Sequence, residues 1–168
     1  MNNQQSIMSR RVARLFAVPC LLTASVAIAD FTSDSKASLE MRNFYLNRDF
    51  RQAGATQAKA AEWGQGFIAR FESGFTEGRV GVGLDAIGSL GLKLDSSSDR
   101  RGTGLLPFDA ASQEPVDDYS ELGLTAKLRV SASVLRVGAL QPWLPVVLYN
   151  DTRLLPSTFQ GSMLTSQD

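Results

Sequence analysis

The sequence predicts an all-β fold built as one antiparallel up-and-down sheet. Apolar and polar residues alternate along five stretches, and successive side chains point to opposite faces only in an extended strand. The connections between these stretches are short and long in turn, which gathers the long ones at one end of the sheet. The longest stretch, RVGVGLDAIGSLGLKLD at 79–95, is about three times the usual strand length of roughly 5–6 residues.

A helix over 79–95 is excluded by the same residues. Helical spacing from Val80 would bury Val80, Gly83, Leu84 and Ile87, which is a poor apolar stripe, and each interior glycine would cost about 1 kcal/mol. The strands expected from the period of two are 36–46, 62–75, 79–95, 120–130 and 133–140, with 158–166 as a sixth candidate.

The connections indicate how the sheet is arranged. Those at 76–78 and 131–133 are tight, whereas those at 47–61, 96–118 and 141–156 are long. Loops above roughly 12–15 residues are uncommon in compact domains. Bacterial outer-membrane barrels have short periplasmic turns and longer extracellular loops, which is the pattern here.

Two folds fit the alternation. In a soluble β-sandwich the apolar face is the core and the charged face is the surface. In a transmembrane β-barrel the apolar face meets lipid and the charged face lines a lumen. Strand length and the asymmetry of the loops favour the barrel, whose tilted spans need about 9–11 residues each.

The first residues have the features of a secretory signal peptide. Arg10, Arg11 and Arg14 are followed by an apolar run at 15–26 and by the small residues of an A-x-A cleavage signal at 27–29. Cleavage is expected between Ala29 and Asp30. This divides the chain into a signal peptide at 1–29 and a partial β-barrel at 30–168.

Composition excludes several functions for residues 30–168. The chain has no histidine, and its single cysteine, Cys20, lies in the predicted signal peptide, so His-based catalysis, disulfides and thiolate metal sites are not expected. The net charge of −3 gives no reason to expect nucleic-acid binding. The GxGxx motifs at Gly64 and Gly81 lie inside strands, and that at Gly102 precedes Pro107, so none fits a nucleotide loop. We expect neither an enzyme nor a metal or cofactor site.

The charged residues on the polar face are the candidate functional residues, because rings and ladders of such side chains give pores their selectivity. By parity this set comprises Glu40, Arg42, Arg70, Glu72, Asp85, Lys93, Lys127, Arg129 and Arg136. The arginines would form a track for a substrate carboxylate, since the guanidinium is a planar donor fork. The alternative is that these charges pair across strands within the wall.

Several stretches in one order resemble a known family. SLEMRNFYLNRDFR, EWGQGFIARFESGFTEGRVGVGLDAIGSLGLKLD, GTGLLPFD, DDYSELGLTAKLRVS and LRVGALQPWLPV…RLLPSTFQG are similar to the amino-terminal part of the OprD-type outer-membrane porins of pseudomonads. The resemblance implies an eighteen-stranded, substrate-selective channel in the cell outer membrane for small solutes such as amino acids, with some members admitting carbapenems. It also implies lipid, lipopolysaccharide, the barrel-assembly machinery and small anionic or zwitterionic solutes as partners.

The resemblance also assigns a role to the third long connection. In the family a loop at this position folds inward and narrows the channel, which makes Trp143, Tyr149, Asp151 and Arg153 candidate constriction residues. The apolar run WLPVVLY within it would equally allow the loop simply to pack against the wall.

The likeness covers only part of a family member, so we expect a truncated porin of five or six strands. An open sheet edge in lipid leaves backbone groups unsatisfied at several kcal/mol each, and the isolated chain is therefore not expected to insert stably. The alternative function is a soluble secreted β-sheet module that binds through its long loops.

Overall fold

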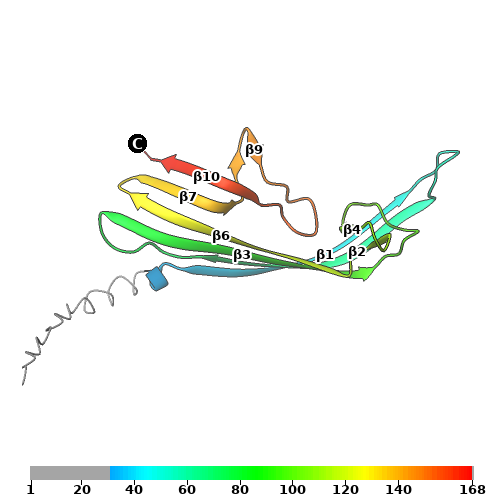
Figure 1. Cartoon of the computed structure of the whole chain (residues 1–168), viewed down its shortest axis with the longest axis horizontal. Coiled ribbons are helices and arrows are strands. Elements are labelled where there is room, and N and C mark those ends of the chain that lie inside the picture. The colour runs from blue at the N-terminus through cyan, green and yellow to red at the C-terminus, as the bar shows by residue number, and fades with distance from the viewer. Residues whose placement is uncertain (1–30, 168) are drawn as a thin grey trace, which may run out of the picture.

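The described residues form one curved antiparallel sheet and two short hairpins, and the connection at 141–158 lies above the concave side of the sheet (Figure 1). The structure, a computed structural model, describes residues 31–167. The six strands pair in the order β1-β2-β3-β6-β7-β10, so each strand of the sheet lies beside its neighbour in the sequence. Their bounds are β1 Lys36–Asp49, β2 Lys59–Glu72, β3 Val80–Asp95, β6 Asp118–Val130, β7 Ser133–Leu140 and β10 Phe159–Ser166.

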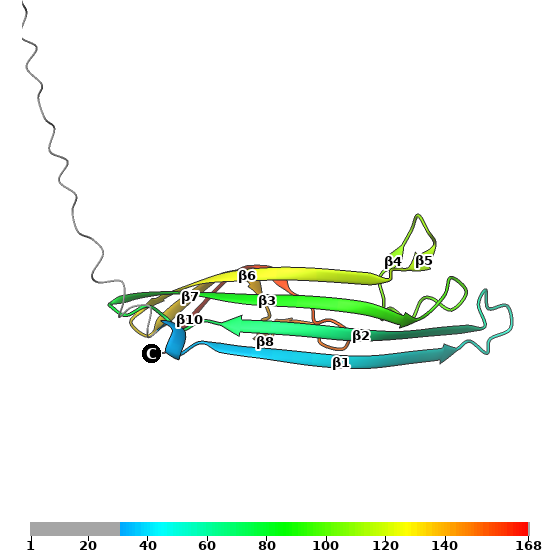
Figure 2. The same ribbon diagram turned by 90° about the horizontal axis from the view of Figure 1, so that it is seen from below.

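Two short hairpins lie within the long connections. The connection after β3 carries β4 (Phe108–Asp109) and β5 (Glu114–Pro115), and the connection after β7 carries β8 (Trp143–Leu144) and β9 (Val147–Leu148). Figure 2 shows the turns after β2 and β6 at one end of the sheet and the connections after β1 and β3 at the other. The predicted alternation of loop lengths is thus confirmed.

All five predicted strands form, and the sixth candidate is a strand as well. β1 and β2 are extended at the long-loop end beyond the predicted bounds, because they stay in register as far as the pair Asp49 and Lys59. Beyond Glu72, however, the end of the predicted 62–75 strand is irregular. Unbroken alternation from Trp63 would place Phe75 on the apolar face, but Phe75 lies against the cations Lys127 and Arg129.

The two faces of the sheet differ in what covers them. The apolar face is open: Leu122 is 72% exposed, Val82 is 50% exposed and Leu124 is 53% exposed. A β-sandwich would bury these side chains against a second sheet, and residues 31–167 contain no such sheet. The β-sandwich alternative is therefore wrong for this part of the chain, and the exposed face is the one that a barrel turns toward lipid.

The described residues bury few side chains, and the largest apolar cluster lies on the concave side. Leu105, Leu106 and Leu154 form this cluster, and partly buried Phe44, Leu46 and Tyr119 pack against it. Two of the long connections meet there, since Leu105 and Leu106 belong to the connection after β3 and Leu154 to the one after β7. Tertiary packing thus holds these connections to the sheet.

The predicted cleavage site between Ala29 and Asp30 lies outside the described residues. Within residues 31–167, no helix has the length and apolar character needed to cross a membrane.

Candidate functional site

The candidate site is the concave face, where cross-strand register brings the predicted charged residues together. Partners across an antiparallel pair point to the same side of the sheet. Glu72 is opposite Asp85, Asp85 is opposite Thr125, and Lys127 is opposite Arg136, so these side chains from four strands share one face. The register therefore places these charged residues on one face, as the alternation along the strands predicts. What each of them does remains a proposal.

Three of the charged residues form a cluster on β1 and β2. Glu40 accepts hydrogen bonds from Arg42 Nε at 2.6 Å and from Arg70 Nη1 at 2.9 Å. Arg42 also pairs with Asp151 of the connection after β7, with 2.7 Å between Nη2 and Oδ1. Arg42 is therefore held between two carboxylates, and its charge is largely compensated within the chain.

The lysines of the face are also paired. Lys127 Nζ lies 2.5 Å from Asp85 Oδ1 and donates to the carbonyl oxygen of Ser73 at 2.7 Å. Asp85 Oδ1 is buried, and the Lys127 ammonium is the cation that compensates its charge. Lys93 Nζ lies 2.6 Å from Asp117 and donates to the carbonyl oxygen of Pro115. Both lysines thus bind neighbouring segments to the sheet, as the alternative interpretation of wall pairing expects.

Phe75 organises the cations at the tight-turn end. The Arg129 guanidinium lies 4.6 Å from the centre of the Phe75 ring, and Lys127 Nζ lies 4.9 Å from it. Contacts of this kind attract a cation to the negative face of the ring. Arg129 therefore rests on an aromatic surface, with no carboxylate paired to it among residues 31–167.

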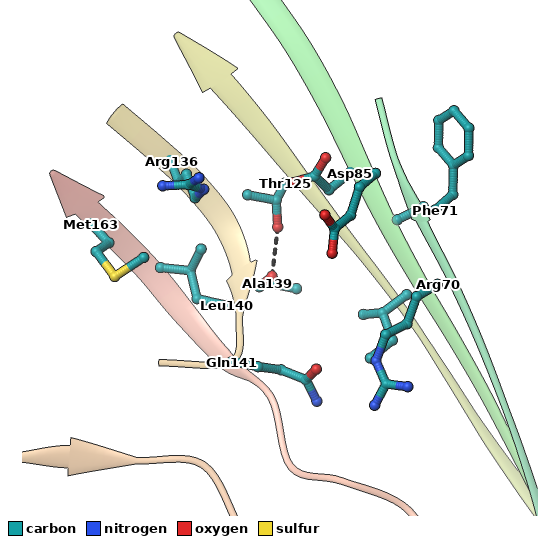
Figure 3. Close-up of a pocket in the computed structure, with 12 residues that line it drawn as sticks. Arg70, Phe71, Asp85, Thr125, Arg136, Ala139, Leu140, Gln141 and Met163 are labelled. Carbon is teal, nitrogen blue, oxygen red and sulfur yellow. Dashed lines mark hydrogen bonds between the residues drawn. The ribbon is translucent and has the colours of Figure 1, made fainter. Parts of the chain in front are cut away.

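Arg136 differs from the other predicted arginines. Its side chain makes a long contact of 3.4 Å with Thr165 Oγ1, and it has no carboxylate partner among the described residues. It borders a hollow of about 220 Å³ on the concave face, with Arg70, Glu72, Asp85 and Gln141 also on its lining. Figure 3 shows Arg136 and Arg70 on opposite sides of this hollow, with Asp85 between them. Two cations and two acids thus line one small open space.

The hollow owes its shape to an inward bend at the end of β7. Gly138 has a φ of 137°, and a side chain there would lie 2.1 Å from the carbonyl oxygen of Leu124. Beyond this glycine Ala139 crosses over β6, where its carbonyl oxygen accepts a hydrogen bond of 2.5 Å from Thr125 Oγ1 (Figure 3). The bend sends the following connection, 141–158, across the concave face rather than outward.

The four predicted constriction residues fall into two groups within 141–158. Asp151 and Arg153 lie against the wall: Asp151 pairs with Arg42, and Arg153 Nη1 donates to the carbonyl oxygen of Thr103 at 3.3 Å. Trp143 and Tyr149 meet edge to face, with ring centres 5.9 Å apart. Trp143 is 74% exposed, on the β8–β9 hairpin. The structure therefore does not bring all four together.

Sequence reasoning missed Leu154, which is fully buried and fixes this connection to β2. A side chain at Gly64 would lie 2.7 Å from Leu154 Cδ2, and one at Gly66 would lie 2.8 Å from its carbonyl oxygen. Two glycines at alternate positions of one strand face were the available signal, because they predict close approach by another segment. The sequence does not reveal which segment approaches.

Within residues 31–167, no three His, Cys, Asp or Glu side chains come together as metal ligands would.

Comparison with known proteins identifies the family. A family model described as "outer membrane porin, OprD family" matches residues 29–168. The porin-like protein GalP of Pseudomonas putida is 43% identical over 153 residues, which are 91% of this chain and 37% of that protein. Porin D of Pseudomonas aeruginosa is 44% identical over 138 residues, which are 82% of this chain and 30% of that porin. This chain therefore spans about a third of the length of these relatives.

Solved structures agree with the sequence relatives. The sheet matches Pseudomonas aeruginosa OccK9 (OpdG) with a TM-score of 0.79 and 54% identity, covering 82% of this chain and 35% of that one. It matches a BenF-like porin from Pseudomonas fluorescens with a TM-score of 0.78 and 44% identity, covering 81% and 35%. These relatives are porins, which are channels and not enzymes. The chain belongs to the OprD family of outer membrane porins, and its location is the cell outer membrane.

Proposed function

We propose that residues 31–167 form part of the wall of a substrate-selective channel that passes small anionic or zwitterionic solutes. Passage of this kind follows the concentration gradient and involves no covalent step and no cofactor. The observation that carries the proposal is the hollow of Figure 3, where Arg136 has no carboxylate partner among the described residues. The concave face would then be the lumen.

The charges around the hollow support a solute that carries a carboxylate. A guanidinium presents planar donors that match a carboxylate, and Arg136 has these donors free of any acid described in the chain. Glu72 on the same lining suits an ammonium group of a zwitterion, whereas Asp85 is already paired with Lys127. The solved structure of OpdK from Pseudomonas aeruginosa with vanillate, a protein 46% identical to this chain, is consistent with a carboxylate solute.

The connection 141–158 would narrow the passage. It crosses the concave face, and Asp151 and Arg153 are fixed there by Arg42 and by Thr103. The exposed Trp143 and its neighbour Tyr149 would give the passage an apolar side. In this proposal Arg129 contributes to the positive potential of the lumen, whereas Lys93 and Lys127 are paired with acids and bind neighbouring segments to the wall.

Assembly partners follow from the family location. The exposed apolar face would contact outer-membrane lipid and lipopolysaccharide, and the barrel-assembly machinery would insert the protein. The soluble binding module proposed as an alternative is not favoured, because its function would require this apolar face to be covered.

The experiment compares three solutes of nearly equal size in proteoliposomes. Residues 31–167 replace the aligned part of Porin D, and swelling rates are measured for benzoate, benzyl alcohol and benzylamine. Removing one charge at about 5 Å in a water-filled pore changes the interaction by about 0.8 kcal/mol. Arg136→Gln should therefore lower the benzoate to benzyl alcohol ratio about fourfold.

The matched control is Arg51→Gln, which removes the same charge from an exposed connection far from the hollow. It should leave the ratio unchanged. An unchanged ratio in Arg136→Gln, in protein whose heat-modifiable gel mobility shows a folded barrel, would contradict the proposal.

A further inference from the structure

One glycine motif of the sequence, GTGLL at 102–106, has a carboxylate as its ligand. Glu62 of β2 accepts hydrogen bonds from the backbone N–H groups of Gly102 at 2.9 Å, Leu105 at 3.1 Å and Leu106 at 3.3 Å. The Thr103 hydroxyl donates to the same carboxylate. The loop therefore surrounds one acid with four donors, as glycine loops do with anions.

The conformation of the loop depends on its glycines. Gly102 has a φ of 101° and Gly104 a φ of 79°, values that residues with a side chain rarely adopt. These two positions turn the N–H groups of Gly102, Leu105 and Leu106 toward Glu62. The donors that a nucleotide phosphate would need are thus occupied by a side chain of the same protein.

Glu62 is buried without a cation. It is 1% exposed, and it forms no ion pair with any residue in the 31–167 range. Burying a charge is costly unless it is paired or hydrogen-bonded, so the loop donors are what make this carboxylate tolerable. Conversely, the carboxylate holds the loop against β2.

The loop in turn supports the connection 141–158. Leu105 and Leu106 form the apolar cluster with Leu154, and the carbonyl oxygen of Thr103 accepts a hydrogen bond from Arg153 at 3.3 Å. On its other side Leu154 rests on Gly64 and Gly66 of β2. Leu154 is therefore enclosed between the strand and the loop that Glu62 holds.

We propose that Glu62 is a positioning residue. Its carboxylate binds the 102–106 loop, and the bound loop fixes the 150–157 segment over the concave face. The segment then stays in place although Glu62 does not touch it. The consequence for solute passage rests on the proposed function, whereas the linkage between the two connections does not.

Trypsin cleavage in detergent micelles of the Porin D chimera that carries residues 31–167 tests this linkage, because one arginine lies directly before the 102–106 loop and another lies within the 150–157 segment. Arg101 precedes Gly102, and Arg153 precedes the buried Leu154. In the unaltered protein both bonds should be cut slowly relative to Arg51, which lies in an exposed connection. Cleavage rates are measured by mass spectrometry, with Arg70 and Arg129 in the strands reporting on the fold of the sheet.

Glu62→Ala should raise cleavage after both Arg101 and Arg153 at least about tenfold, since hydrogen bonds to a charged group are each worth more than one factor of ten. Glu62→Gln keeps one acceptor oxygen and should give a smaller rise at both sites. Leu154→Ala should raise cleavage after Arg153 alone. Glu114→Gln, an exposed glutamate in the same connection, should change neither rate.

Several results would overturn the proposal. One is a Glu62→Ala variant in which cleavage becomes faster after Arg101 but not after Arg153, because Glu62 would then hold only the 102–106 loop. Rapid cleavage after Arg153 in the unaltered chain is another. If trypsin cuts the Glu62→Ala variant throughout its strands, the Glu62→Gln variant distinguishes the two explanations. Cleavage throughout the strands of Glu62→Gln as well would show that Glu62 stabilises the sheet and does not specifically position the 150–157 segment. Solute flux is not part of this measurement, so its outcome is distinguishable from failure of the proposed function.

Discussion

Arg42 and Arg136 lie on the same concave face and were predicted for the same role, yet their surroundings differ. Arg42 is held by Glu40 and Asp151 and also donates to the carbonyl oxygen of Arg153. Arg136 has no carboxylate among the described residues and borders an open hollow. The position of a residue within the alternation of its strand assigns its charge to one face of the sheet. The partners of that charge decide whether it holds a segment in place or is available to a solute.

The substitution with the largest expected effect adds a methyl group beneath the 150–157 segment, which Arg42 helps to hold in place. In Gly66→Ala the new Cβ would lie 2.8 Å from the carbonyl oxygen of Leu154, which is backbone and cannot rotate away. Overpacking of this kind costs about 1–3 kcal/mol. We expect faster hydrogen exchange at 150–157 and an unchanged benzoate to benzyl alcohol ratio at the Arg136 hollow.

Gly88→Ala is the matched control for this change. It is also a strand glycine, but a Cβ there would meet only Leu122 Cδ1, at 4.0 Å. Exchange at 150–157 should stay as in the unaltered protein. Equal effects of the two substitutions would show that β-strand propensity, and not the contact with Leu154, is responsible.

Substitution of each arginine should distinguish their roles directly, with a smaller effect than that of Gly66→Ala. Arg42→Gln removes the ion pair with Asp151, which is partly exposed and therefore worth about 0.2–1 kcal/mol. Exchange at 150–157 should rise by a factor of up to about five. Arg136→Gln should leave that exchange unchanged and alter the solute ratio instead. If the two variants loosen the segment equally, the distinction between a fastening and a solute-facing arginine is wrong.

The smallest expected effect depends on pH and lies away from both arginines. Asp109 accepts hydrogen bonds from the backbone N–H groups of Ala111 and Ser112, and these bonds hold the pKa of its carboxyl below the ordinary 3.8. Since the folded pKa is lowered, the stabilisation is present above the unfolded value and is lost as the pH falls through the folded one.

The β4–β5 hairpin should therefore loosen only in acid below about the ordinary aspartate range. Amide chemical shifts of Ala111 and Ser112 followed by NMR would report it, and Asp109→Asn should remove the transition. A transition of the same size at Thr152 would instead link this hairpin to the Arg42 cluster.

Much of the fold was predictable because alternation in an extended strand is local. Val80, Val82 and Leu84 alternate with Gly81 and Gly83 whatever the rest of the chain does, so the strand and its apolar face follow from the residues alone. The irregular segment beyond Glu72 was not predictable. Phe75 has the parity of the apolar face, but its contacts with Lys127 and Arg129 come from another strand.

The sequence by itself determined the strands, their up-and-down order and the face on which the charges lie. Each of these depends on a period of two and on the length of the connections. Only the tertiary structure decided which charges are paired and which segments cross the concave face. Glu62 and the 102–106 loop meet about forty residues apart in the chain, and no local pattern records a contact made at that separation.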